Sequence, residues 1–403
     1  MKKDGFAAAG SIRMESMTKR VFGPCRGCKS LVTLTLFGLY LSLTGCESAL
    51  LMPLIQLDSP DSYIYTGMKF LDQEKFNQAG KSFETALRLD RNNSPALTGR
   101  GLVRAYTSDF RGARDDLQQA RDLAKTGTEK LLNHTAMIRY YTQSRLDTGW
   151  LAESEAEFRK ALTIDGENAA ACYFMGLAYK QACSFHEAGL MFDRVVRLKS
   201  DYLAEALAEL AFLRKVQQAM PGTDAGRRIA LADSITRADA AVLLMRELRI
   251  GDLYEQKAKK SSRMNLRPAM PAETTADDMV NHPWREDVEG ILKIGVKGLE
   301  NDPEGHFAPD SFLTRASFAL ILQDIMATVA GDETLAKRFD GFKSPFPDVT
   351  GTSPYFNAAM VATTRGLMSV SSKATGEFSL HNKVSGIEAL LSIRALKDKW
   401  NYQ

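Results

Sequence analysis

Small and aromatic residues in the first half of this chain of 403 residues recur at a constant interval of 34 positions. Ala79 returns as Ala113, and Phe158 returns as Phe192. A fixed period of about 34 residues is typical of stacked helix-turn-helix units. One such unit buries too little surface to be stable alone, so neighbouring units must stack into a continuous core. The period therefore predicts an array of helical hairpins, and it makes binding, rather than catalysis, the first expected role.

The residue types at the recurring positions have a steric reason. Gly or Ala at a helix crossing lets two backbones approach closely, and an aromatic side chain fills the space between units. Gly67 and Gly101 are small residues of this kind, and Phe83 is such an aromatic. The small–aromatic–small pattern resembles the tetratricopeptide repeat family. The resemblance covers residues 60–217, with units at 60–93, 94–127, 131–168 and 169–202 and a capping helix at 203–216. In the third unit Thr142 stands where the glycine is expected, and seven extra residues precede Ser154.

The resemblance implies a right-handed superhelix whose concave groove holds a protein or peptide partner. The alternative is that the groove is only solvated. The groove has no dense basic clamp for a terminal carboxylate. By resemblance, the residues that face it are Met68, Tyr106, Arg139, Gln143, Tyr173, Leu177 and Lys180.

The N-terminus has the features of a bacterial export signal. Basic residues precede an apolar run from Leu31 to Leu43, which is shorter than the roughly 20 residues that span a bilayer. The run ends in Leu-Thr-Gly-Cys at 43–46, which resembles a lipobox, so residues 1–45 are expected to be a lipoprotein signal peptide and Cys46 the lipidated residue. Residues 46–59 would then be a tether. Glu47, rather than Asp, follows the cysteine and by resemblance favours sorting to the outer membrane, facing the periplasm.

A second internal repeat lies in the C-terminal half, residues 218–403. Ile-Thr-Arg-Ala-Asp at 235–239 returns as Leu-Thr-Arg-Ala-Ser at 313–317, each before an apolar helix. Asp348, Tyr355 and Gly386 belong to a third pass. The order resembles the S-layer homology family, in units at about 218–255, 277–330 and 344–400. The expected fold class is therefore all-α, a tetratricopeptide-type superhelix followed by a mainly helical three-unit bundle.

The S-layer resemblance implies binding of peptidoglycan or a wall-linked glycan in grooves between the units. The motif arginine would meet an anionic group, which a guanidinium suits because it offers two parallel donors. Gly386 stands where the third arginine is expected and puts one groove in doubt. The alternative is that the arginines brace loops by hydrogen bonds to carbonyl groups. The candidate glycan-binding residues are Arg237, Trp284, Glu304, Gly305 and Arg315.

Several function classes lack support in the sequence. Seven of the 52 basic and two of the 49 acidic residues lie in residues 1–45, which leaves 45 basic and 47 acidic residues. That balance gives no indication of nucleic-acid binding. The five histidines show no metal-ligand spacing, and no nucleophile elbow occurs, so the sequence predicts no enzyme, no cofactor and no metal site. Cys25 and Cys28 precede the expected cleavage site, whereas Cys172 and Cys183 are expected to be buried as small hydrophobic residues.

Together these features predict a cell-envelope lipoprotein that acts as a tether or scaffold. It would bind a protein through the array, a wall glycan through the S-layer-type domain, and the membrane through its lipid. The alternative is an assembly factor or pilotin-like chaperone for a secretion or pilus machine, with no glycan binding. The sequence names neither the protein partner nor the glycan, the oligomeric state, the membrane leaflet, or the true start among Met1, Met14 and Met17.

Overall fold

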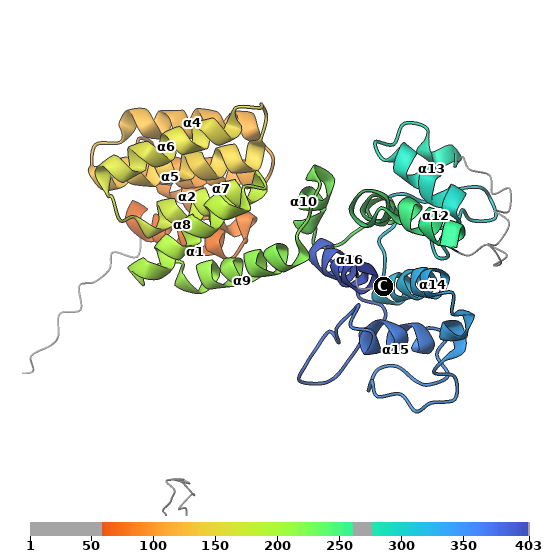
Figure 1. The fold of residues 1–403 in the computed structure, drawn as a ribbon. Coiled ribbons are helices and arrows are strands. Elements are labelled where there is room, and N and C mark those ends of the chain that lie inside the picture. Colours follow the sequence, from red (N-terminus) through yellow and green to blue (C-terminus); the bar gives the residue numbers. More distant parts are fainter. Residues whose placement is uncertain (1–58, 261–275, 402–403) are drawn as a thin grey trace, which may run out of the picture. The chain divides into compact units, whose positions relative to one another are not determined.

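The computed structural model describes residues 59–260 and 276–401, which contain sixteen α-helices and no β-strand (Figure 1). The described residues also form two isolated antiparallel β-bridges, between Thr236 and Phe312 and between Thr314 and Lys383. The expected all-α fold is confirmed. Within these residues no helix combines the length and the apolar character needed to cross a membrane. The predicted signal peptide, Cys46 and the tether up to residue 58 lie outside the described residues.

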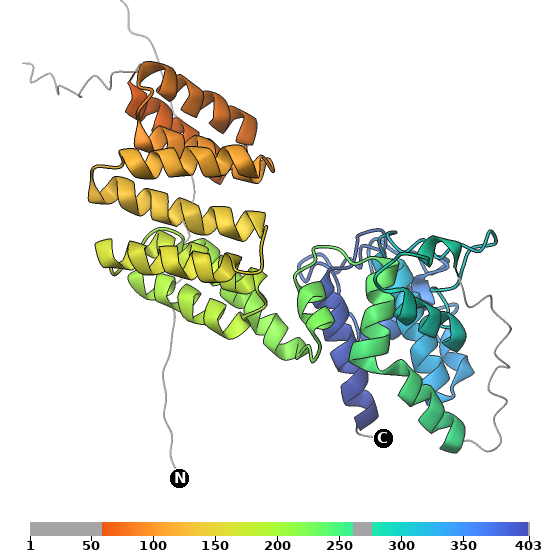
Figure 2. The same ribbon diagram turned by 90° about the horizontal axis from the view of Figure 1, so that it is seen from above.

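Helical hairpins form the first part of the described chain and stack in sequence order (Figure 2). α1 contacts α3, α3 contacts α5, and α5 contacts α7, while within the described array no contact of similar extent joins any two of α2, α4, α6 and α8. The odd-numbered helices therefore form the inner side of the stack. The helices are α1 (Pro60–Asp72), α2 (Phe76–Leu89), α3 (Ser94–Tyr106), α4 (Phe110–Leu123), α5 (Gly127–Ser144), α6 (Trp150–Ile164), α7 (Ala169–Gln181) and α8 (Phe185–Leu198).

Glycines at the helix crossings explain the small–aromatic pattern. A Cβ atom on Gly67 would lie 2.7 Å from the ring of Phe83, and one on Gly176 would lie 2.6 Å from the ring of Phe192. Both rings are fully buried. Any larger residue at either glycine would push an aromatic ring out of the core, so the spacing of the pattern follows from packing.

Turns between hairpins repeat the same polar chemistry. Asn93 caps α3 by accepting from the amide of Ala96 at 3.0 Å, and Asn168 caps α7 by accepting from Ala171 at 2.9 Å. Asp90 holds the Asn93 side chain at 3.3 Å. An asparagine at the N-cap satisfies a backbone donor that the helix leaves unpaired, so this motif fixes where the second and fourth hairpins begin.

The third hairpin differs from the others, as its irregular sequence predicts. α5 has 18 residues, against 13 in α3 and in α7, and this longer helix holds much of the additional length. It begins at Gly127, four residues before the predicted unit, because Thr126 and Glu129 form a capping box. The predicted start at residue 131 was therefore too late.

α9 (Leu203–Ala219) belongs to two hydrophobic cores. Ala206 and Leu213 pack with the end of the array, and Val216 and Ala219 pack with the C-terminal domain. The helix extends three residues beyond the predicted cap. Its second half therefore joins the core that follows.

A closed ring of backbone hydrogen bonds organises the C-terminal domain. The amide of Ile235 donates to the carbonyl of Val384 at 2.8 Å, that of Val384 to Leu313 at 3.1 Å, and that of Leu313 to Ile235 at 3.0 Å. The three residues precede the three copies of the repeated motif, so the repeat has threefold pseudosymmetry at its centre. The helices are α10 (Asp224–Ala230), α11 (Arg237–Val242), the π-helix η1 (Leu243–Leu248), α12 (Ile250–Lys260), α13 (Arg285–Ile294), α14 (Arg315–Ala330), α15 (Phe356–Thr364) and α16 (Gly386–Asn401), with short 3₁₀ turns η2 (Asp277–Met279) and η3 (Glu333–Lys337).

Two of the three units share a further detail. The Asp278 carboxylate accepts from the amides of Phe307 and Ala308, and the Asp348 carboxylate accepts from those of Phe378 and Ser379. Ala308 and Ser379 both have positive φ, at 55° and 57°. A non-glycine residue in this conformation is uncommon, so each aspartate holds a strained loop in place.

Candidate functional site

Arg237 is the first residue of α11, and its guanidinium donates hydrogen bonds to backbone carbonyls of the same domain. Nε donates to the carbonyl of Phe307 at 2.8 Å, and the other nitrogens donate to the carbonyls of Gly298 at 2.9 Å and Glu300 at 2.7 Å. The guanidinium also lies 4.7 Å from the centre of the Phe307 ring. Burial lowers the pKa of Arg237, although Glu300 and other acids nearby oppose that effect. The side chain ties α11 to the loop of the second unit.

Arg315 repeats this arrangement at the start of α14. It donates to the carbonyls of Phe378 and Ser369, each at 2.6 Å, and pairs with Glu388. Its side chain is 5% exposed. The structure therefore favours the bracing alternative for Arg315, because a ligand would have to displace these partners to reach it. Direct glycan contact by Arg237 or Arg315 stays a prediction.

Gly386 is the first residue of α16, the position that Arg237 and Arg315 occupy in α11 and α14. A Cβ atom there would collide with the carbonyl oxygen of Ile229 in α10, and the Gly386 amide donates to the carbonyl of Ala232 at 2.8 Å. The backbone of the first unit thus fills the place where an arginine side chain would begin. The absence of the third arginine has a packing reason.

Trp284 lies at the N-cap of α13, beneath a charged pair. The Arg246 guanidinium is 5.0 Å from the Trp284 ring centre and donates twice to Asp287, at 2.9 and 2.7 Å. The side chain of Asp287 is 8% exposed, whereas that of Arg246 is 42% exposed. Trp284 is half-buried, and the Arg246 guanidinium lies over its ring.

The other two predicted glycan contacts lie on a turn away from this pair. Gly305 has φ of 88° and donates to the carbonyl of Asp302 at 3.0 Å, and Glu304 is exposed. A shallow cavity of about 240 Å³ opens at the end of α13. Its lining is Ile291, Leu292, Gly295, Val296, Leu299, Glu300 and Asn301. None of the five predicted residues lines it.

The inner face of the array brings several predicted groove residues together. Arg139 donates through Nε to the Tyr106 hydroxyl at 3.0 Å, and its guanidinium lies 4.3 Å from the centre of the Phe174 ring. Tyr106 stacks on Phe76 at 5.3 Å. These contacts link α3, α5 and α7 across three hairpins, so the side chains form one preordered surface.

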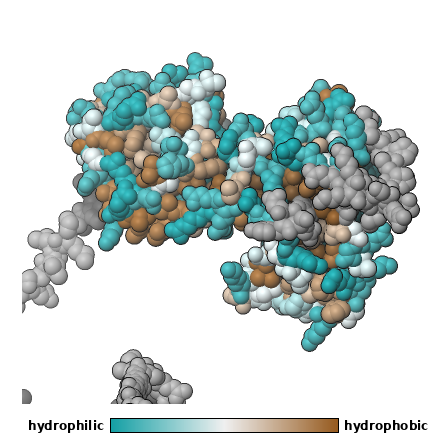
Figure 3. All heavy atoms as spheres, in the orientation of Figure 1, coloured by the Kyte–Doolittle hydropathy of each residue, from teal (hydrophilic) through white to brown (hydrophobic). Residues whose placement is uncertain are grey.

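A second cluster continues this surface onto α9. Tyr173 stacks on Tyr202 at 4.8 Å, and Lys180 binds Glu209 at 2.6 Å while lying 4.6 Å from the Phe212 ring centre. Burial, with the nearby charges of Glu209 and Glu205, raises the pKa of Tyr173 to about 12. The remaining predicted residues do not enter these clusters: Met68 and Leu177 are half-buried against hydrophobic cores, and Gln143 is exposed. Figure 3 shows apolar residues on the array surface interspersed with polar ones.

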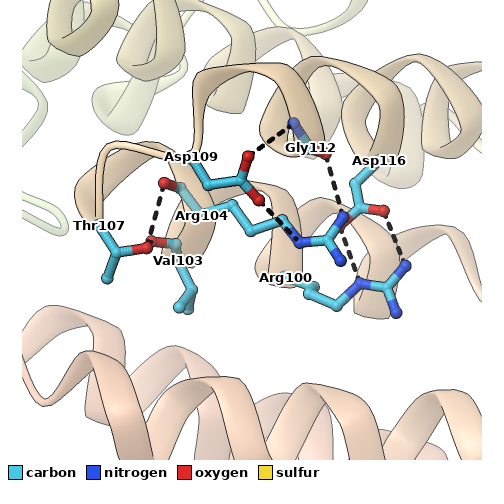
Figure 4. A network of polar contacts seen from close by, with 7 residues as sticks. All are labelled: Arg100, Val103, Arg104, Thr107, Asp109, Gly112 and Asp116. Carbon is cyan, nitrogen blue, oxygen red and sulfur yellow. Dashed lines mark hydrogen bonds and ion pairs between the residues drawn. The ribbon is translucent and has the colours of Figure 1, made fainter.

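Two buried acidic groups in the array are structural. Asp116 of α4 accepts from Arg100 at 2.8 and 2.7 Å and pairs with Arg104 at 2.9 Å (Figure 4). Glu157 of α6 binds His134 at 2.6 Å, Lys160 at 2.9 Å and Arg121 at 3.0 Å. Each carboxylate joins its own helix to a neighbouring helix and is nearly inaccessible to solvent. Neither is therefore a candidate site.

Sequence reasoning missed Asp72, Phe174, Tyr202 and Glu205 on the inner face. Burial raises the pKa of Asp72, with Arg139 opposing and Glu205 adding to the increase. Tyr202 lies just before α9, at the boundary between the last unit and the cap, where repeat positions no longer indicate a direction. The charge and aromatic content of α9 could have suggested its part in the surface.

Comparisons with known proteins add little to this description. No family model and no curated protein matches the chain. Among solved structures, a thermophilic tetratricopeptide repeat protein of Thermus thermophilus is 15% identical with a TM-score of 0.35, covering 50% of this chain and 98% of that one. A tetratricopeptide repeat protein of Parabacteroides merdae is 16% identical with a TM-score of 0.25, covering 83% of this chain and 98% of that one. These values support no argument about function, and the helical array stands on its own contacts.

Proposed function

We propose that this chain is an envelope lipoprotein that scaffolds an assembly, holding a protein partner on the inner face of the array and a wall glycan on the C-terminal domain. The observation that carries the first part is the preordered surface of Tyr106, Arg139, Tyr173 and Tyr202, in which Arg139 lies over the buried ring of Phe174. Aromatic residues and arginine are enriched where proteins bind proteins. The stacked rings are already fixed, so a partner would order few side chains on binding.

The membrane attachment in this proposal rests on the sequence alone. The apolar run and the Leu-Thr-Gly-Cys segment ending at Cys46 support lipidation, and Glu47 supports the outer membrane as the destination. Two or more acyl chains hold a protein stably in a bilayer. The array and the C-terminal domain would then work within reach of the membrane surface.

The wall-binding part rests on Trp284 more than on the motif arginines. Trp284 offers an aromatic ring to a sugar, and Arg246, which lies over that ring and pairs with Asp287, keeps 42% of its side chain exposed. The expected role of Glu304 and Gly305 is to shape their own turn, which lies apart from Trp284. Arg237 and Arg315 support the glycan surface indirectly in this proposal, by holding the loops that flank it.

One observation favours the alternative, an assembly factor that binds no glycan. Arg315 is almost fully enclosed, and Arg237 has its three donor groups directed at carbonyl oxygens. If the repeated motif serves the fold alone, the C-terminal domain is a protein-binding or structural module. The two proposals differ in whether the domain binds wall material.

Co-sedimentation of the full chain, in detergent, with purified cell-wall sacculi tests the wall-binding part. We expect the wild type to pellet with the sacculi and Trp284→Ala to remain largely in solution, with unchanged circular dichroism. Tyr65→Ala removes an exposed aromatic residue of α1 and serves as the matched control. If the wild type stays in solution at low and moderate salt, the assembly-factor alternative replaces wall binding.

A further inference from the structure

Arg139 and Lys180, two predicted groove residues of the inner face, are already engaged within the array. Arg139 is held by the Tyr106 hydroxyl at 3.0 Å and by the Phe174 ring at 4.3 Å. Lys180 is paired with Glu209 at 2.6 Å, and both of these side chains are less than one fifth exposed. A binding partner therefore meets few positive groups that remain free to pair with it.

Two acidic side chains of the same face, unlike Lys180, have no salt-bridge partner among the described residues. Asp72 and Glu205 are exposed, and within the described residues neither makes a salt bridge. Asp72 shares one stripe of α1 with Tyr65 and Met68, and Glu205 shares one stripe of α9 with Glu209, because residues three or four apart share a helix face. Tyr202 is the N-cap residue of α9, three positions before Glu205. Asp201 adds a third carboxylate near Tyr202.

The charge of Arg139 does not cancel the effects that disfavour the ionised form of Asp72. Partial burial raises the pKa of Asp72, and Glu205 raises it further, although Arg139 acts in the opposite direction. Burial also raises the pKa of Tyr202, where Asp72, Asp201 and Glu205 oppose Arg139. Asp72 and Glu205 come from the first and the last helix of the array, so the surface between them is negative and aromatic.

We propose that the inner face of the array selects a basic protein segment, whose lysine or arginine side chain lies between Asp72 and Glu205 and against the stacked rings of Tyr173 and Tyr202. This inference rests on the proposed function of the inner face and adds the charge of the partner to it. The two carboxylates supply the charge complementarity, and aromatic rings attract cations within about 6 Å. An acidic segment would face uncompensated like charges at both helices.

The test uses the full chain, immobilised in detergent, and two pools of random nonapeptides with a fixed central residue, lysine in one pool and glutamate in the other. Retained peptides are counted by mass spectrometry. We expect lysine peptides to be retained about five-fold more than glutamate peptides at low salt, in line with modest gains from two partly exposed charges. The ratio should fall at high salt because such charges are screened.

The Asp72→Asn/Glu205→Gln variant is expected to bring the ratio close to one. The matched control is Glu153→Gln/Asp193→Asn, which removes two exposed carboxylates from α6 and α8. This control should retain lysine peptides over glutamate peptides in the same ratio as the wild type. Equal retention of both pools, lost on Tyr173→Ala, would overturn the charge preference and leave the inner face as a protein-binding surface. Retention of neither pool above a bare matrix would overturn both.

Discussion

Arg315 donates a hydrogen bond to the carbonyl of Phe378 at 2.6 Å, across 63 residues of sequence. Arg237 makes the corresponding bond to Phe307 at 2.8 Å. Each guanidinium also lies over the ring of the residue whose carbonyl it binds, at 4.6 and 4.7 Å. The repeated arginine therefore joins the start of one helix to a loop of the following unit, and the domain depends on it for its packing.

Arg315→Ala is expected to lower the free energy of unfolding by about 3 kcal/mol, because it leaves two carbonyls and Glu388 without their partner in a buried place. Urea unfolding of the full chain measures the loss, and amide exchange should show it in residues 369–379. Arg365→Ala, an exposed arginine of the same domain, should change stability by less than about 0.5 kcal/mol. Equal, small effects of both variants would contradict the bracing role.

Gly386→Ala is expected to destabilise the domain strongly, because the new Cβ atom meets the carbonyl oxygen of Ile229. Restoring the motif with Gly386→Arg should be at least as harmful. Gly251→Ala is the control, since nothing lies within 4 Å of a Cβ atom there and the residue is helical in α12. Alanine favours helix by about 1 kcal/mol over glycine. Thermal unfolding that ranks the two alanine variants in the reverse order would refute the packing account.

Glu157 makes the stability of the array sensitive to acid. Burial raises its pKa, but hydrogen bonds from His134 and Lys160 and the charge of Arg121 outweigh burial and lower the pKa to about 2. A lowered folded-state pKa contributes stability above the unfolded pKa, near 4.5, and that stability is lost as the pH falls toward 2.

Glu157→Gln should therefore lower the free energy of unfolding at pH 7 by roughly 2–3 kcal/mol. The difference from wild type should shrink as urea unfolding is repeated at pH 4 and pH 3. Glu153→Gln, exposed on the same helix, should show no such trend. If the difference in free energy of unfolding between Glu157→Gln and wild type stays constant from pH 7 to pH 3, the ionised Glu157 carboxylate contributes nothing to stability.

Asp72→Asn is expected to stabilise the protein at pH 7. The folded-state pKa of Asp72 is raised, so its contribution to stability is present below the unfolded pKa and is lost as the pH rises through the folded pKa. Asp72 is also the last residue of α1, where a negative charge opposes the helix dipole. We expect an increase in Tm of about 1–2 °C at pH 7 and none at pH 3. Asp193→Asn should leave Tm unchanged, and a lower Tm for Asp72→Asn at pH 7 would show that the ionised Asp72 carboxylate does not destabilise the fold.

The sequence predicted most of the array because its packing is local and periodic. Gly67 and Phe83 belong to one hairpin, and the 34-residue interval repeats their contact. The start of α5 could not be placed in this way, because its capping box and its extra length belong to one unit alone. The capping box of Thr126 and Glu129, rather than the repeat, determines where α5 begins.

The candidate sites were harder to predict than the fold. The motif identified Arg237 and Arg315, but residue type alone does not say whether a guanidinium points to a ligand or to carbonyls more than 60 residues away. Likewise, the partners of Arg139 come from α3 and α7. Contacts between segments distant in sequence decide whether such a side chain binds a ligand or braces the fold. The sequence motif shows only which residue types are present.

Site-specific photo-crosslinking in cells tests most directly whether the inner face of the array holds a protein partner. A photoreactive amino acid replaces Gln143, which is exposed on the inner helix α5, or Glu153, which is exposed on the outer helix α6. We expect a discrete crosslinked product at position 143, weakened by Tyr173→Ala, and none at position 153. The same products at both positions, or a product at position 153 alone, would contradict this expectation.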